Sequence, residues 1–309
     1  GALIGLGRLI RVPWFLIAGV VGLMLLENIT PYYTVELRPS SAGLAASVVI
    51  PMLGLLLLKR PHWRMLLVFL GAFMFIGSMQ YNSFPLEAAM GAVLLFFALA
   101  RYQGTERVVL AGAGLFALLW LPVVYVVTRG NPLAINEEES LEAISGLLIP
   151  NMGLAEVANL LQQNLLSPTA LPRTIFLLIL PVMWITRRWP GLWSASNPRV
   201  LYVNFLWAFV LVATVATAAI GFLGVMPWIV GTRWSIAEVG LIGVSLLGLA
   251  GIVVERGLLR WKPVAAVAMA ATVLISGLAG YRLLTYERFP GFNWNPVLAV
   301  MLDGEPGRS

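Results

Sequence analysis

Nine apolar runs, most of them joined by short polar turns, follow one another along this chain. The hydrocarbon core of a bilayer is ~30 Å thick and takes ~20 apolar residues of helix to cross. A chain inside that core must satisfy its own backbone hydrogen bonds, which favours helices. The pattern therefore predicts an all-α, polytopic transmembrane bundle of about nine spans. The runs cover residues 12–26, 44–58, 65–80, 84–100, 108–128, 174–186, 200–224, 235–254 and 264–280.

Composition agrees with this class of protein. Hydrophobic residues make up 60% of the 309 positions and charged residues 11%, whereas soluble domains carry roughly 25% charged residues. A soluble fold would leave much of this apolar surface exposed as one large patch. We expect a single integral membrane domain over residues 1–309, with a long outer loop at 129–173. The tail at 281–309 either lies along the outer surface or leads into an external domain truncated from this chain.

Basic residues predict the orientation, because cytoplasmic loops of membrane proteins carry an excess of Lys and Arg. With the N-terminus in the cytoplasm and the C-terminus outside, thirteen of the 20 basic residues fall in cytoplasmic segments. They are Arg8, Arg11, Lys59, Arg60, Arg64, Arg101, Arg107, Arg187, Arg188, Arg199, Arg256, Arg260 and Lys262. The chain is thus expected to be a multi-pass protein of a bacterial inner membrane. Its net charge of +6 is explained by topology, so no nucleic-acid partner is expected.

The sixth run is the shortest, and it is kept because omitting it would place arginine-rich loops outside. Residues 174–186 fall below the ~17-residue minimum for a span. The run approaches that length only by extending back to Leu171, in which case Arg173 must snorkel toward the headgroups.

Few residues are available for metal or redox chemistry. The chain contains no cysteine, one histidine (His62) and one aspartate (Asp303). Disulfides, thiolate metal sites and zinc sites built from several histidines are excluded. Haem ligation by paired axial residues is excluded as well. We therefore expect neither a metal nor a cofactor.

Three glutamates stand near helix ends on the expected outer side. Glu27 follows the first run, Glu87 opens the fourth and Glu238 lies one turn inside the eighth. The simpler interpretation is that they favour helix dipoles and stay hydrated among the headgroups. The alternative is one converging site for a cation, a proton or a lipid-linked substrate, since ionisable groups near hydrocarbon are often functional. Glu27, Glu87, Glu238 and Arg233, a possible partner of Glu238, are the binding candidates.

The outer loop contains one segment with helical periodicity. Between residues 154 and 166 the apolar side chains fall on one helix face, and Glu156, Asn159 and Gln163 fall on the opposite face. This predicts an amphipathic helix that lies on the outer leaflet, caps the bundle or docks another subunit. Its apolar face would consist of Leu154, Val157, Ala158, Leu161 and Leu165.

Five tryptophans near span ends are interpreted as interfacial anchors, because indole rings favour the headgroup level. They are Trp184, Trp189, Trp193, Trp228 and Trp234.

Three classes of function remain. The first, which we favour, is a non-enzymatic bundle that binds or translocates a lipid-like or small polar substrate, or that acts as the membrane subunit of a larger complex. Its partners would be the bilayer, other membrane subunits or a lipid-linked substrate. A second class is a membrane-embedded transferase, and a third is the sensory or anchoring domain of a longer protein.

The transferase class rests on a resemblance. Glu27 after the first span and Glu87 between the third and fourth are arranged in a way similar to the acids of polytopic glycosyltransferases that use polyprenyl-phosphate donors. The resemblance covers these two positions, and it implies that Glu27 and Glu87 are catalytic, as a base or as metal ligands. The first outer loop is shorter here than in that family, which leaves less room for a donor site.

Overall fold

The computed structural model describes residues 1–26, 39–79, 84–129, 149–168, 170–189, 191, 196–224 and 236–285. Within these ranges the chain forms α-helices and two 3-10 helices, and no strand. The helices are α1 (Ala2–Leu9), α2 (Trp14–Leu26), α4 (Pro39–Lys59), α5 (Trp63–Met79), α6 (Phe84–Arg101), α7 (Gly104–Arg129), η4 (Ile149–Asn151), α9 (Leu154–Leu166), α10 (Leu171–Ile185), α11 (Pro198–Phe222), α12 (Ile236–Glu255), η5 (Leu258–Arg260) and α13 (Lys262–Thr285).

Each of the nine apolar runs coincides with one helix, which confirms the all-α class. Three helices in the described ranges are long and apolar enough to cross a membrane, namely α6, α11 and the Lys262–Arg282 part of α13. The pair α9 and α10, which meet at 73°, passes the same test as one bent unit. Apolar helices below that length include α2 and α5.

One helix was not predicted. Residues 2–9 precede the first apolar run and contain Arg8, and the structure folds them into α1. A Cβ on Gly7 would lie 2.7 Å from Ile17 of α2, and a Cβ on Gly243 would meet both Leu3 and Met24. Helix α1 is therefore antiparallel to α2, and it packs within the bundle against α2, α4 and α12.

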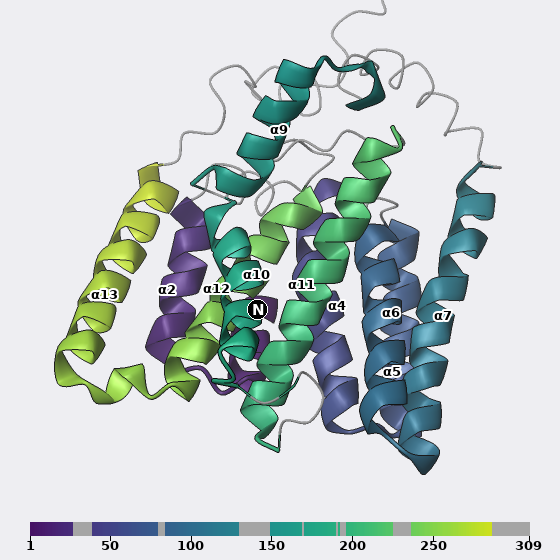
Figure 1. Ribbon diagram of the computed structural model, residues 1–309, viewed down its shortest axis with the longest axis horizontal. Coiled ribbons are helices and arrows are strands. Elements are labelled where there is room, and N and C mark those ends of the chain that lie inside the picture. The colour runs from purple at the N-terminus through teal and green to yellow at the C-terminus, as the bar shows by residue number, and fades with distance from the viewer. Residues whose placement is uncertain are drawn as a thin grey trace, which may run out of the picture.

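The helices form one upright bundle (Figure 1). Helix α4 packs against α1, α5, α6, α11 and α12, and α11 packs against α6, α10 and α12, so these two lie at the centre. Helices α4, α5, α6 and α7 contact one another as a four-helix group. At the opposite edge α13 packs on α2, and only 11% of its apolar window is buried.

The basic turns gather at one end of this bundle, which we call the basic end. The Tyr102 hydroxyl, between α6 and α7, donates to the Leu58 carbonyl at the end of α4 over 3.0 Å. Arg256, after α12, donates to the Arg188 carbonyl after α10 over 2.7 Å. The structure thus brings together turns that the charge pattern assigned to one side of a membrane.

The opposite end is covered by η4 and α9, and we call it the capped end (Figure 1). Gly224 ends α11 with a φ of +69°, a conformation that favours glycine, and a Cβ there would lie 2.9 Å from Pro150 of η4. Ile149 and Leu160 form a small core with Ala218 of α11. The cap is therefore attached directly to the end of α11.

Large apolar side chains point away from the bundle on its peripheral helices. Examples are Val273 on α13 (73% exposed) and Leu178 on α10 (62%). In water such a surface would associate or aggregate, because soluble monomers rarely expose extensive apolar patches. Surrounded by acyl chains, the same surface carries no penalty.

Candidate functional site

Glu87 is the one candidate carboxylate whose side chain the structure describes, and it lies inside the protein. It occupies the first turn of α6, two residues after Pro85, and its exposed fraction is 0%. Proline is favourable in a first helical turn because the N–H it lacks would have no intrahelical partner there. The carboxylate also complements the positive end of the helix dipole. Local sequence therefore places Glu87 at a helix start, and packing then encloses it.

The neighbouring residues of α6 show where the carboxylate points. Gly91, four residues on, contacts α7 so closely that a Cβ there would lie 2.9 Å from the Gly114 carbonyl oxygen. Met90, three residues on, packs against the Gly54 position of α4. Residues three and four apart share a helix face. Glu87 therefore faces the interior of the α4–α7 group, one turn nearer the capped end than the contact of Gly91 with Gly114.

This location contradicts the simpler interpretation of Glu87. A glutamate that stayed hydrated among headgroups would be exposed at the rim, whereas this side chain is completely enclosed by protein. Burying a carboxylate costs several kcal/mol, by an order-of-magnitude estimate, unless hydrogen bonds or opposite charges compensate. Helix-dipole stabilisation, at about 0.3–1 kcal/mol for exposed groups, does not offset such a cost. Fully enclosed ionisable side chains are rare in membrane bundles and are commonly functional, so the burial of Glu87 favours a functional role.

The other predicted site residues are only partly accessible to comparison. Glu27 and Arg233 lie outside the described residues. Glu238 belongs to the first turn of α12, and its side chain is likewise outside the described part. Two residues later, Gly240 lies against Ser47 of α4, and α4 also packs against α6. Helix α4 thus stands between the helix of Glu238 and the helix of Glu87, and the hypothesis of one converging site stays a prediction.

A second buried charge lies at the capped end, where α9 turns into α10. Arg173 is 1% exposed, and its guanidinium donates to the Asn164 carbonyl near the end of α9. The Thr174 hydroxyl donates to the next carbonyl, that of Leu165, over 2.6 Å. The last carbonyls of a helix have no intrahelical partner, and a cation there complements the dipole. Helix α10 does begin at Leu171, and its 15 residues stay below the ~17-residue minimum for a span. The prediction that Arg173 snorkels is wrong, because its side chain is buried.

Helix α9 is present where predicted, and its inward face is shifted. Val157, Leu161 and Leu165 are partly buried as expected, whereas Leu154 is 91% exposed and Ala158 is exposed. The most buried members are Leu160 and Asn164, which lie between the expected positions. Asn164 tolerates burial because its amide donates to the Leu160 carbonyl over 2.9 Å. The polar face of Glu156, Asn159 and Gln163 is exposed as predicted.

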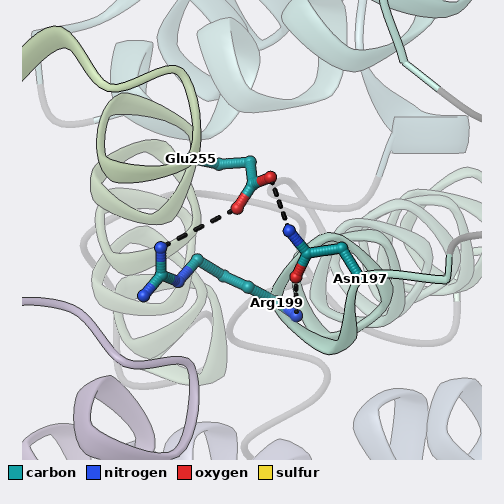
Figure 2. A network of polar contacts seen from close by, with 3 residues as sticks. All are labelled: Asn197, Arg199 and Glu255. Carbon is teal, nitrogen blue, oxygen red and sulfur yellow. Dashed lines mark hydrogen bonds and ion pairs between the residues drawn. The ribbon is translucent and has the colours of Figure 1, made fainter.

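Charged side chains at the basic end form a different kind of network (Figure 2). The Asn197 side chain caps α11 by accepting from the Arg199 N–H over 3.0 Å, and its amide donates to Glu255 over 2.7 Å. Arg199 and Glu255 form an ion pair at 3.8 Å, with side chains 28% and 16% exposed. These contacts join the start of α11 to the end of α12 within reach of solvent, so we regard the network as a structural clamp.

Tryptophans at the basic end divide into two groups. Trp184 packs edge-on against Trp207 with ring centroids 4.7 Å apart, and Trp189 is only 9% exposed, so both pack into the bundle. In the described part of the chain the exposed indoles are those of Trp14 (79%), Trp63 (55%) and Trp261 (69%), each at or just before the start of a helix. These three, which the sequence argument did not single out, have the position of an interfacial belt. Trp193, Trp228 and Trp234 lie outside the described residues.

Comparison with protein families, with characterised proteins and with solved structures finds no match for this chain. A helical bundle by itself does not specify a function. The functional argument therefore rests on the residues.

Proposed function

We propose that this chain is an integral membrane bundle of nine spans that binds or translocates a small polar or lipid-like substrate. Its basic end faces the cytoplasm and its capped end faces outward. The observation that carries the proposal is the complete burial of Glu87 within the α4–α7 group. Ionisable groups inside membrane bundles are rare, and they commonly mark the path of a substrate, an ion or a proton. Glu87 is the group that the substrate or its coupling ion meets.

The neighbouring helix supplies a matched reference for this residue. Glu106 occupies the first turn of α7 as Glu87 occupies the first turn of α6, but the Glu106 side chain is exposed at the basic end. Dipole stabilisation is available to both, so it does not explain why only one of them is enclosed. No observation among the described residues favours the transferase or the anchoring alternative.

The proposal is tested with Glu87→Gln and Glu106→Gln in protein purified in mild detergent. Unfolding is followed by tryptophan fluorescence in the chlorides of sodium, potassium or magnesium and with a short-chain polyprenyl phosphate. A ligand at 100 times its Kd stabilises the folded state by about 2.7 kcal/mol. We expect at least one of these compounds to raise the Tm of the wild type and of Glu106→Gln, and to leave Glu87→Gln unshifted.

The outcomes separate function from packing. If Glu87 is only structural, Glu87→Gln lowers the free energy of unfolding by about 1–3 kcal/mol. Every compound then raises the Tm of this variant as much as it raises the Tm of the wild type. That result would overturn the proposal. A shift produced by the polyprenyl phosphate alone would identify the substrate as lipid-like.

A further inference from the structure

A groove runs along the outward face of α2, between α1 and α13, far from Glu87. Its volume is about 460 Å³. Trp14, Ala18 and Leu25 of α2 lie along its floor, and residues of α1 and α13 form its two sides. The distance from Trp14 to Leu25 along the helix is ~16 Å at 1.5 Å per residue, close to the ~15 Å depth of one leaflet.

The two walls of the groove are held by close helix contacts. Helix α13 is parallel to α2, because the Gly19 position contacts Thr272 and the Gly22 position contacts Ile275. On the other side, α1 packs against α2 through Gly7 and Ile17. Small residues let helices approach closely in lipid, where packing and not the hydrophobic effect drives association. The walls are therefore continuous helices, and the groove is part of the packed architecture.

The lining is apolar except at its basic-end mouth. Arg8 of α1 lines the groove there, beside the exposed indole of Trp14. Arg8 is exposed, and its guanidinium makes no ion pair or hydrogen bond with the described residues. Arg11, in the turn between α1 and α2, is exposed as well. An apolar channel of leaflet depth thus ends at an arginine, with the exposed Arg11 in the adjoining turn.

We propose that this groove binds an anionic phospholipid of the cytoplasmic leaflet, with one acyl chain along α2 and the phosphate on Arg8. Charge complementarity selects this occupant: cationic side chains at the inner membrane surface attract acidic headgroups, and guanidinium groups pair well with phosphate. The indole of Trp14 suits the headgroup level. The inference shares the membrane orientation of the proposed function and is independent of Glu87.

Two glycines of α13 allow a matched steric test. Gly280 lines the groove, and Gly277 does not. A Cβ at either position would meet nothing within 4 Å, so a larger side chain should not disturb the bundle. Gly280→Leu fills the groove, whereas Gly277→Leu adds the same side chain elsewhere on the same helix. Ser276→Leu, also in the lining, serves as a second blocking variant if Gly280→Leu fails to fold.

Binding of phosphatidylglycerol and of phosphatidylcholine to the purified full chain is measured by native mass spectrometry, with oligomeric state read from the same spectra. The wild type and Gly277→Leu should retain phosphatidylglycerol in preference to phosphatidylcholine. Gly280→Leu should lose it, and Arg8→Gln should bind it about fivefold more weakly, the effect expected of one surface cation. Arg107→Gln, which removes an exposed arginine at the same end, should bind as the wild type does.

Each alternative outcome contradicts the proposal in a different way. Equal phosphatidylglycerol binding by Gly280→Leu and Gly277→Leu would place the lipid elsewhere. Lipid binding that is lost in Gly280→Leu but unchanged in Arg8→Gln would show that Arg8 does not bind the headgroup. Equal retention of both lipids would show that the groove does not select an anionic headgroup. A change of oligomeric state in Gly280→Leu with unchanged lipid binding would identify the occupant as a helix of another chain. If the lipid test contradicts the groove but ligands still raise the Tm of the wild type and not of Glu87→Gln, the proposed function is unaffected.

Discussion

The two ends of the bundle differ in how far their charged side chains are buried. At the capped end Glu87 and Arg173 are enclosed, with exposed fractions of 0% and 1%. At the basic end most Lys and Arg side chains are exposed, and the Arg199–Glu255 pair remains within reach of solvent. Enclosed charges must be matched by specific partners, whereas solvated charges need none. The capped end is therefore where single substitutions should have large effects, and the basic end is where they should have small ones.

This difference also sharpens the charge argument for orientation. Two arginines assigned to the outer side, Arg173 and Arg282, are directed at helix ends: Arg173 donates to the Asn164 carbonyl and Arg282 to the Leu26 carbonyl. Both complement helix C-termini. They serve local structure, so their positions on the expected outer side are explained without a role in topology.

The largest effect is expected for Arg173→Ala. Removing the guanidinium leaves the Asn164 carbonyl without this donor and deletes a large buried side chain, which together should cost about 2–4 kcal/mol. Thermal unfolding in detergent measures the loss. The control is Arg107→Ala, an exposed arginine of the basic end, which should change stability by less than about 0.5 kcal/mol. Equal effects of the two variants would remove the contrast between the ends.

The face of α9 gives the next largest effect. Leu160 packs against Ile149 and Ala218. Its substitution by alanine should lower the free energy of unfolding by about 2 kcal/mol. Leu154→Ala, on a side chain that is 91% exposed, should be nearly neutral. The same unfolding assay compares them. If Leu154→Ala lowers stability more than Leu160→Ala does, the buried face of α9 is the one predicted from the sequence and not the one observed.

The clamp at the basic end should yield smaller losses. Asn197→Ala removes the N-cap of α11 and the bond to Glu255, and about 1 kcal/mol is expected. Glu255→Gln, which breaks only a partly exposed ion pair, should cost about 0.5 kcal/mol. Raising the salt concentration should reduce the difference between Glu255→Gln and the wild type. A loss of several kcal/mol from Glu255→Gln would show that this end, too, depends on enclosed charge.

A similarly small effect is expected for Tyr102, which lies between α6 and α7. Burial raises the pKa of its phenol above the usual 10.0. The folded state therefore holds the proton more tightly. The contribution of Tyr102 to stability is intact below the usual pKa of 10.0 and is lost as the pH rises through the raised pKa. Tyr102→Phe should cost about 0.5–1 kcal/mol at neutral pH and flatten part of the alkaline decline. An unchanged alkaline decline in unfolding scans of the variant would contradict this assignment.

The sequence predicted the helices well because run length and hydropathy determine which segments suit a bilayer. Helix α1 was missed for the same reason, since eight residues are too few to span and Arg8 was taken as a topology signal. Arg173 was misjudged because its partner is a backbone carbonyl, and main-chain groups leave no pattern in a sequence.

The sequence identified Glu87 as a candidate residue, but it did not predict that this side chain is buried. A glutamate in the first turn of a helix can be hydrated or enclosed, and only the packing of neighbouring helices around α6 decides between the two. The face of α9 was ambiguous in a similar way. Helical periodicity defines a broad stripe, and contact with Ala218 of α11 selects its centre at Leu160.

The orientation of the two ends is most directly tested by cysteine labelling, which is straightforward because the chain has no native cysteine. Asn159→Cys places a thiol on the exposed face of α9, and Glu106→Cys places one on the exposed start of α7. In intact cells a membrane-impermeant maleimide should label Asn159→Cys, and it should label Glu106→Cys only after the membrane is permeabilised. Labelling of both variants from outside, or of Glu106→Cys alone, would contradict the account.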